Sequence, residues 1–171
     1  MSQISFRSAR LGIVLSLFLN LFSVVQAQAA LEKRYPTSPS PDLTPGALCE
    51  RPTRKRYEEG IAYCERDVDS SLKREIMENY DRKYGYRVTQ MERSLFKIDH
   101  FIPLCMGGSN QETNLWPQHS WVYEQTDPLE GLSCEKMAQG KLLQRDAVAM
   151  IREAKLNLER VPAILARIKA L

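Results

Sequence analysis

The chain lacks several features that would assign it to familiar protein classes. Its four cysteines include no Cys-x-x-Cys pair, which argues against a structural zinc ribbon. No Lys followed by Ser or Thr stands after Gly107-Gly108 at the spacing of a phosphate-binding P-loop, so this glycine pair predicts a turn. The sequence also contains no internal repeat and no long low-complexity segment.

A hydrophobic run long enough to cross a membrane is missing as well. The apolar stretch from Leu11 to Val25 has 15 residues, fewer than the ~20 that span a bilayer. Arg7 and Arg10 precede it and Ala27-Gln28-Ala29 follows it, which is the three-part pattern of a secretory signal. We therefore predict a signal peptide over 1–29, cleaved at these alanines, and an exported protein of the periplasm or the extracellular space. A retained membrane anchor is the less favoured alternative.

Neither sign of charge dominates. The chain has 24 Lys and Arg against 21 Asp and Glu, and loss of the two signal-peptide arginines leaves 22 against 21, a net charge near +1. Bulk charge therefore points to no class of partner. The densest basic cluster consists of Arg51, Arg54, Lys55 and Arg56. We predict that Arg54, Lys55 and Arg56 contact nucleic acid, with a solvated basic loop as the alternative.

In an exported protein the four cysteines predict up to two disulfides, for which three pairings exist. We favour Cys49 with Cys64, because both lie outside the stretch that carries the chemistry. That choice leaves Cys105 to pair with Cys134.

Composition divides the rest of the chain into an arm and one domain. Residues 30–46 are rich in Pro, Ser and Thr without an apolar period, so we predict an extended, disordered arm. Residues 47–171 suffice for a single domain. Helices are expected from a cap at Asp69 or Ser70 to Gly85, from a cap at Asp127 to Gly140, from Gln144 to Asn157, and from Pro162 to Lys169. A strand over Leu95 to Ile102, a turn at Gly107 to Asn110 and a returning strand at Thr113 to Trp116 predict a β-hairpin.

The stretch from Phe96 to His119 holds both histidines of the protein and the residues suited to phosphodiester cleavage. His100, with an ordinary pKa of ~6.5, is the natural general base. Asp99 is a hard oxygen ligand for a divalent metal, and on an extended strand its side chain points away from that of His100. Across the turn, Asn114 can orient the imidazole, and His119 can complete the metal site through a ring nitrogen.

At these residues the chain resembles the HNH endonuclease family, whose nuclease core is the ββα-metal fold. The resemblance rests on Ile98-Asp99-His100-Phe101-Ile102-Pro103-Leu104, then Gly107-Gly108-Ser109-Asn110, then Asn114-Leu115-Trp116-Pro117-Gln118. It is closest to small exported bacterial HNH proteins, is strong over 95–119, and is weaker over Cys49 to Cys64 and the C-terminal helices. It implies His100 as the general base, Asp99 as a metal ligand and Asn114 as the residue that holds the hairpin. It departs from the family at the last motif position, which falls on Tyr123, a poor Mg²⁺ ligand.

These observations together predict an α+β protein with a ββα-metal (HNH) hairpin-and-helix core and additional flanking helices. We expect a monomeric, metal-dependent endonuclease that hydrolyses DNA, and RNA as an alternative, with low sequence specificity and no stable membrane association. Mg²⁺ is the expected ion, with Mn²⁺ or Zn²⁺ as alternatives. The rival hypotheses are an inactive HNH-like secreted module that binds nucleic acid or protein, and a disulfide scaffold without a nucleic-acid role.

Overall fold

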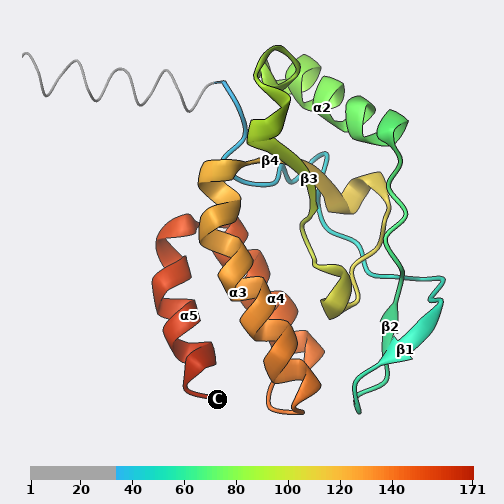
Figure 1. The fold of residues 1–171 in the computed structure, drawn as a ribbon, viewed down its shortest axis with the longest axis vertical. Coiled ribbons are helices and arrows are strands. Elements are labelled where there is room, and N and C mark those ends of the chain that lie inside the picture. Colours follow the sequence, from blue (N-terminus) through green and yellow to red (C-terminus); the bar gives the residue numbers. More distant parts are fainter. Residues whose placement is uncertain (1–33) are drawn as a thin grey trace, which may run out of the picture.

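The computed structural model describes residues 34–171, so the predicted signal at 1–29 lies outside the described residues. The described part is mixed α+β, with two small antiparallel sheets and four α-helices (Figure 1). The strands and helices are β1 (Arg54–Arg56), β2 (Ile61–Tyr63), α2 (Ser70–Tyr84), β3 (Phe96–His100), β4 (Leu115–His119), α3 (Ser120–Ala138), α4 (Gln144–Leu156) and α5 (Val161–Lys169). None of these helices is long and apolar enough to cross a membrane.

Strands β3 and β4 form the antiparallel pair at the centre of the chain, as predicted. Phe96 lies opposite His119, and His100 lies opposite Leu115. Because directly opposed residues share a face, the side chains of His100 and His119 lie on one face and that of Asp99 on the other. The returning strand begins at Leu115, later than the sequence predicts, because Glu112–Asn114 form a 3-10 turn before it.

Helix α3 follows β4 without a loop, which corrects the predicted start at Asp127. The helix begins at Ser120, and Nδ1 of His119 caps it by accepting a hydrogen bond from the Trp121 amide at 3.1 Å. Pro128 therefore lies inside the helix, where loss of one backbone hydrogen bond costs about 3 kcal/mol. Burial of Val122 and Leu129 on the same helix offsets this cost.

Helix α2 has the two ends that its sequence predicts. The carboxylate of Asp69 accepts a hydrogen bond from the Leu72 amide at 2.8 Å. At the other end Gly85 takes the left-handed conformation, with φ 71°, and donates its amide to Asp81. Local capping chemistry thus sets both ends of this helix.

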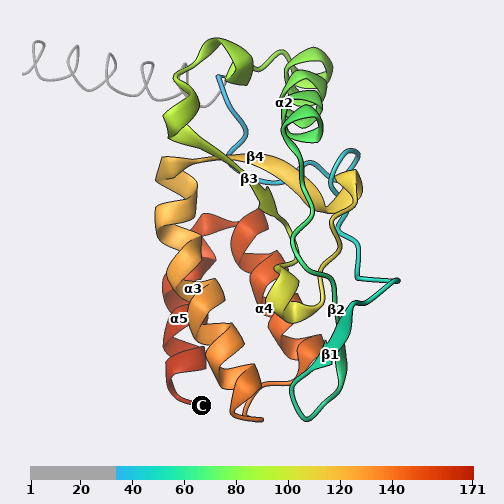
Figure 2. The same cartoon turned by 45° about the vertical axis from the view of Figure 1, so that its right-hand side comes forward.

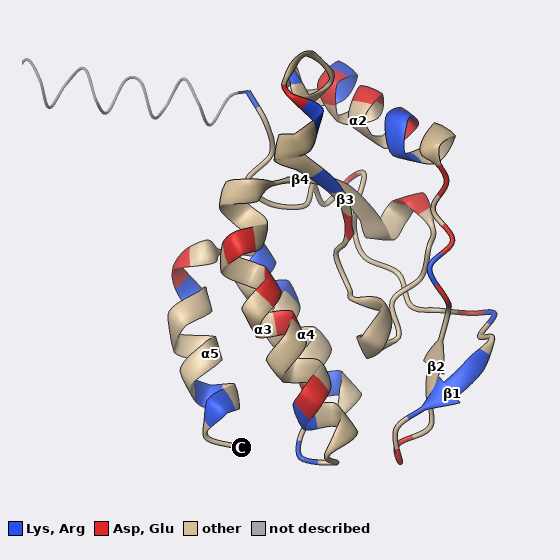
Figure 3. Cartoon of the chain, viewed as in Figure 1, with Lys and Arg blue, Asp and Glu red and all other residues tan. Residues whose placement is uncertain are grey.

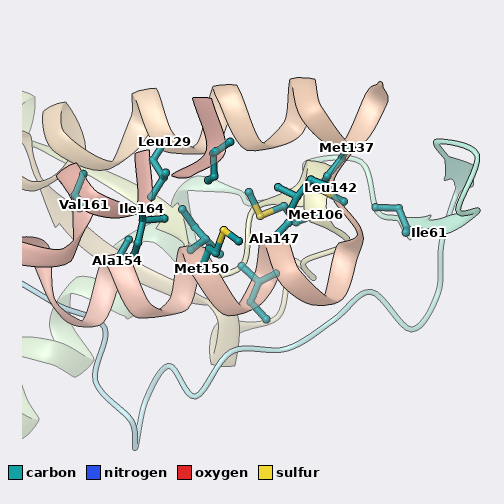
Figure 4. Close-up of a cluster of buried hydrophobic side chains, with 13 residues drawn as sticks. Ile61, Met106, Leu129, Met137, Leu142, Ala147, Met150, Ala154, Val161 and Ile164 are labelled. Atoms are coloured by element: carbon teal, nitrogen blue, oxygen red, sulfur yellow. The ribbon is translucent and has the colours of Figure 1, made fainter. Parts of the chain in front are cut away.

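The described residues form two hydrophobic clusters. The larger cluster joins α3, α4 and α5, and the close-up shows their side chains meeting between the helices (Figure 4). The second packs α2 against β3 and β4, with Trp116 and Tyr80 almost fully buried. In two views of the chain the hairpin runs between α2 and the three C-terminal helices (Figures 1 and 2).

The segment before the first strand differs from the predicted disordered arm in its described part, residues 34–46. The ring of Tyr35 stacks on that of His119, with 4.0 Å between centroids. Thr44 is buried and donates its hydroxyl to the Leu115 carbonyl at 2.8 Å. A tyrosine and a threonine thus anchor a segment whose composition alone indicates disorder.

The cysteines pair as favoured from the sequence. Cys49 joins Cys64 with 5.8 Å between Cα atoms, and Cys105 joins Cys134 with 5.9 Å. The first bridge closes the β1–β2 hairpin, and the second ties the loop after β3 to helix α3. Two disulfides fit an oxidising, extracellular-type environment.

Gly108 gives a test of how tightly the loop after β3 is closed. A Cβ atom placed there would lie 1.8 Å from the Ile102 carbonyl oxygen, which is backbone and cannot move aside. We expect Gly108→Ala to lower the free energy of unfolding by roughly 3 kcal/mol, as in other overpacked sites. In the matched variant Gly131→Ala, the Cβ has no neighbour within 4 Å and lies in a helix. This variant should gain up to about 1 kcal/mol. Urea unfolding of both variants measures the difference, and equal stability would contradict the close approach.

Candidate active site

The imidazole of His100 lies at the end of β3 with both ring nitrogens engaged. Nδ1 is 3.3 Å from the Arg66 guanidinium, and Nε2 is 3.0 Å from Oδ1 of Asn110. A guanidinium can only donate, so Nδ1 must carry the lone pair. The Asn110 amide nitrogen donates to the Glu65 carbonyl at 2.6 Å, which directs its oxygen at the ring. His100 is therefore held as the tautomer protonated on Nε2, with its basic atom facing Arg66.

Burial keeps this imidazole neutral. Only 3 % of His100 is exposed. The pKa of His100 is lowered to about 4, mainly by burial and also by the Arg66 charge, while the Asn110 hydrogen bond works in the opposite direction. At neutral pH the ring is thus a free base that can accept a proton on Nδ1.

Asn110 separates His100 from an open pocket of about 540 Å³. The pocket is lined by Asn110 and its neighbours on one side and by Arg51 and Cys64 of the disulfide loop on the other. The Arg66 guanidinium, which also donates to the Ile98 carbonyl at 2.8 Å, belongs to the segment that leaves this loop. Arg51 therefore lines a space open to solvent together with the acidic residues Glu50 and Asp67, and His100 and Arg66 lie behind Asn110.

Asn114 is fully buried and holds the loop between β3 and β4 closed. Its Oδ1 accepts from the Ile102 amide at 2.9 Å. Its amide nitrogen donates to the carbonyls of Ile102 and Ser109, each at 2.9 Å. Asn114 thus makes the contacts expected of a residue that holds the hairpin. The side chain that contacts the His100 ring is that of Asn110.

Asp99 lies on the other face of the hairpin, in a cluster of charges. Its Oδ2 is 2.8 Å from the Lys155 ammonium, and its Oδ1 is 3.6 Å from that of Lys97. Burial alone would raise the pKa of Asp99, but the nearby ammonium of Lys155 outweighs it and lowers the pKa. Lys155 also lies 2.6 Å from Glu130, whose pKa burial raises to about 7. Glu130 thus faces Lys155 from within α3.

The structure does not bring His119 together with Asp99. The two side chains lie on opposite faces of the hairpin, and His119 caps α3 while its ring contacts Tyr35 and Phe96. Tyr123, at the last motif position, has the Lys97 ammonium over its ring, 4.9 Å from the centroid. Within residues 34–171 no group of three or more His, Cys, Asp or Glu side chains is placed to hold a metal ion.

The predicted nucleic-acid contacts form strand β1, which lies at one edge of the molecule (Figure 3). Arg54 and Arg56 both lie over the ring of Tyr63, at 4.9 and 4.8 Å from its centroid, and Lys55 is exposed between them. The Cys49–Cys64 bridge connects this hairpin to the pocket beside Asn110. The basic edge and one part of the pocket lining, Glu50, Arg51 and Cys64, therefore belong to the same disulfide-closed loop.

Three residues of the site were not predicted from the sequence: Arg66, Asn110 and Lys155. Arg66 is 34 positions from His100, and nothing in its local sequence links the two. Asn110 stands in a turn motif that explains it without further function. Lys155 did carry a signal, because it follows Ala147 and Ile151 at four-residue intervals on the apolar side of its helix.

The neutral state of His100 predicts how stability depends on pH. Its pKa is about 4 when folded and about 6.5 when unfolded, so the unfolded state binds the proton first as pH falls. This histidine's contribution is constant above about pH 6.5 and declines between about pH 6.5 and 4. By about pH 4.5 the loss reaches roughly 2 to 3 kcal/mol.

Urea midpoints of the parent protein and His100→Gln, compared across this range, isolate that contribution. The raised pKa of Glu130 makes the folded state gain stability as pH falls, which is the opposite effect. This effect is common to both proteins and cancels in the difference between them. His119→Gln is the matched control, and its effect should be smaller because that ring is more exposed. A stability difference between parent and His100→Gln that stays constant with pH would contradict the buried neutral imidazole.

Comparison with known proteins adds no identification. No model of a known protein family matches the chain, and neither a curated protein nor a solved structure is significantly similar to it. Function is therefore argued from the geometry of the site.

Proposed function

We propose that this protein is an exported endonuclease that hydrolyses phosphodiester bonds of nucleic acid, with His100 as the general base. The observation that carries the proposal is the fixed tautomer of His100: its lone pair on Nδ1 faces the Arg66 guanidinium, and its Nε2 partner Asn110 lines an open pocket. A neutral imidazole can take a proton from water, and a guanidinium is suited to two phosphate oxygens. Both groups needed at a scissile phosphate therefore meet at one point.

The reaction follows from these placements. A phosphate entering beside Arg66 takes over its guanidinium, which frees Nδ1 of His100. Nδ1 then removes a proton from a water molecule, whose oxygen attacks phosphorus as the bond to the leaving oxygen breaks; solvent protonates that oxygen. The negative phosphate favours the imidazolium that forms. Oδ1 of Asn110 continues to accept a hydrogen bond from the Nε2–H group of His100. Arg66 stabilises the charge that builds on the phosphate.

Substrate binding is assigned to the basic edge. Arg54, Lys55 and Arg56 lie on a strand that the Cys49–Cys64 bridge joins to the pocket. Contacts from such side chains to the phosphate backbone are independent of sequence. The proposal therefore includes low sequence specificity, and it covers DNA and RNA alike.

The expected divalent metal does not fit the residues predicted to bind it. Asp99 is already bound by Lys155 and Lys97, and His119 serves as a helix cap on the opposite face. No step of the proposed reaction is routed through a metal. The expectation of Mg²⁺, Mn²⁺ or Zn²⁺ stays a prediction, and the cleavage assay tests it directly.

A nucleic-acid-binding module without activity is the second candidate. The observation in its favour is the 3 % exposure of His100, because the Arg66 side chain must move before water reaches Nδ1. The two candidates share the basic edge and the pocket. They differ in whether bound nucleic acid is cut.

Cleavage assays separate these candidates. Mature protein is incubated with supercoiled plasmid, single-stranded DNA and RNA in Mg²⁺, Mn²⁺ or EDTA. We expect His100→Ala to lower the rate by about 10² to 10⁴, the usual contribution of a general base. Arg66→Ala should lower it at least about tenfold, with partial recovery in Arg66→Lys, which keeps the charge and loses the paired donors.

Glu135→Gln, an exposed change on α3, serves as the control for handling and folding. Binding without cleavage in every ion would favour the inactive module. Cleavage that survives in a folded His100→Ala variant would refute the assignment of the base.

The basic edge makes a separate prediction about salt. Replacing Arg54, Lys55 and Arg56 with Gln should weaken binding and reduce the slope of log K against log salt by up to about 2 to 3. The matched control removes three charges from α2, at Arg74, Arg82 and Lys83, and should leave the slope nearly unchanged. Fluorescence anisotropy of a labelled oligonucleotide measures both, and equal losses would show that binding depends only on net charge.

A further inference from the structure

Lys155 is a buried ammonium at the junction of three elements. It stands in the last turn of α4, and none of its side-chain surface is exposed. Its Nζ donates to Oδ2 of Asp99 at 2.8 Å and to the backbone carbonyl of His100 at 2.6 Å, both from β3. The Glu130 carboxylate of α3 lies 2.6 Å from the same atom as an ion pair. Three oxygens from two elements thus surround one positive charge supplied by a third.

This arrangement has the composition of a site for a hard cation. Divalent ions such as Mg²⁺ and Mn²⁺ are bound by carboxylate and carbonyl oxygens that converge on one point. Here those oxygens converge on an ammonium that belongs to the chain. A divalent ion at Asp99 would have to displace the Lys155 ammonium or lie beside it at a distance where like charges repel.

We propose that Lys155 is the resident cation of the Asp99 site, where it takes the place of a divalent metal ion and closes the site to one. The two carboxylates are neutralised from within the chain, with Lys97 adding a second ammonium 3.6 Å from Asp99. This inference deepens the proposed endonuclease function and rests on it for its catalytic meaning. Its test measures ion binding and not cleavage, so the two can fail separately.

The experiment measures Mn²⁺ binding by isothermal titration calorimetry, together with the thermal midpoint at constant ionic strength. Four full-length mature proteins are compared: the parent, Asp99→Asn, Lys155→Ala, and the double variant Lys155→Ala/Asp99→Asn. The alanine leaves two carboxylates facing an empty space. Glu135→Gln, which removes an exposed carboxylate from the helix that bears Glu130, is the control for weak surface binding.

The parent should show no saturable Mn²⁺ binding at this site, so its titration should not differ from that of Asp99→Asn. Lys155→Ala should gain one site per molecule, with a rise of its thermal midpoint in Mn²⁺, and the double variant should lose both. If Lys155→Ala unfolds without ions, refolding on addition of Mn²⁺, absent in the double variant, supports the proposal equally.

Two results would overturn the proposal. One is stoichiometric Mn²⁺ binding by the parent that disappears in Asp99→Asn, because the site would then be open to metal with Lys155 present. The other is a folded Lys155→Ala variant that binds no Mn²⁺, because Lys155 would then not be what closes the site. If Lys155→Ala fails to fold in any ion, the comparison of the parent with Asp99→Asn decides alone.

Discussion

A buried ammonium joins helix α4 to the central hairpin, where Lys155 reaches Asp99 and the His100 carbonyl. Apolar contacts also connect the two hydrophobic clusters, since Leu158 packs against both and α3 contributes Val122 to one and Leu129 to the other. The buried charge adds a directional constraint, because it must find its partners or remain uncompensated at high cost. The position of His100 therefore depends on a residue 55 positions away that makes no contact with its ring.

The imidazole itself is set in a polar enclosure built from three separate segments. The hairpin supplies the ring, the turn at Asn110 fixes its tautomer, and the segment after the first disulfide brings Arg66 to its lone pair. Asn114 keeps the turn in place by satisfying three backbone groups that would otherwise be buried without partners. Orientation of the ring and closure of the loop are thus divided between two asparagines.

Sequence patterns predicted the elements whose causes are local. The caps of α2 at Asp69 and Gly85 and the turn after β3 follow from residue type and spacing. The start of α3 did not, because Pro128 is a strong local signal that burial of the surrounding helix overrides. The neighbours of Asp99 and His100 were also out of reach, since Lys155 and Arg66 arrive through long-range folding. The sequence suggested His119 for the metal site because it is near Asp99 along the chain. In the structure His119 lies opposite Phe96, and because side chains alternate along a strand, it lies on the face opposite Asp99.

The two disulfides also have a consequence for when this site comes into being. One closes a loop with a sequence separation of 15 that carries the basic strand, and the other spans a separation of 29 between the loop after β3 and α3. In the chain-entropy account, loops of these lengths contribute about 3 to 4 kcal/mol each, a large share of the stability of an ordinary domain. A newly made chain with reduced thiols lacks this contribution. The basic edge and the histidine enclosure therefore reach their full stability only once the thiols are oxidised.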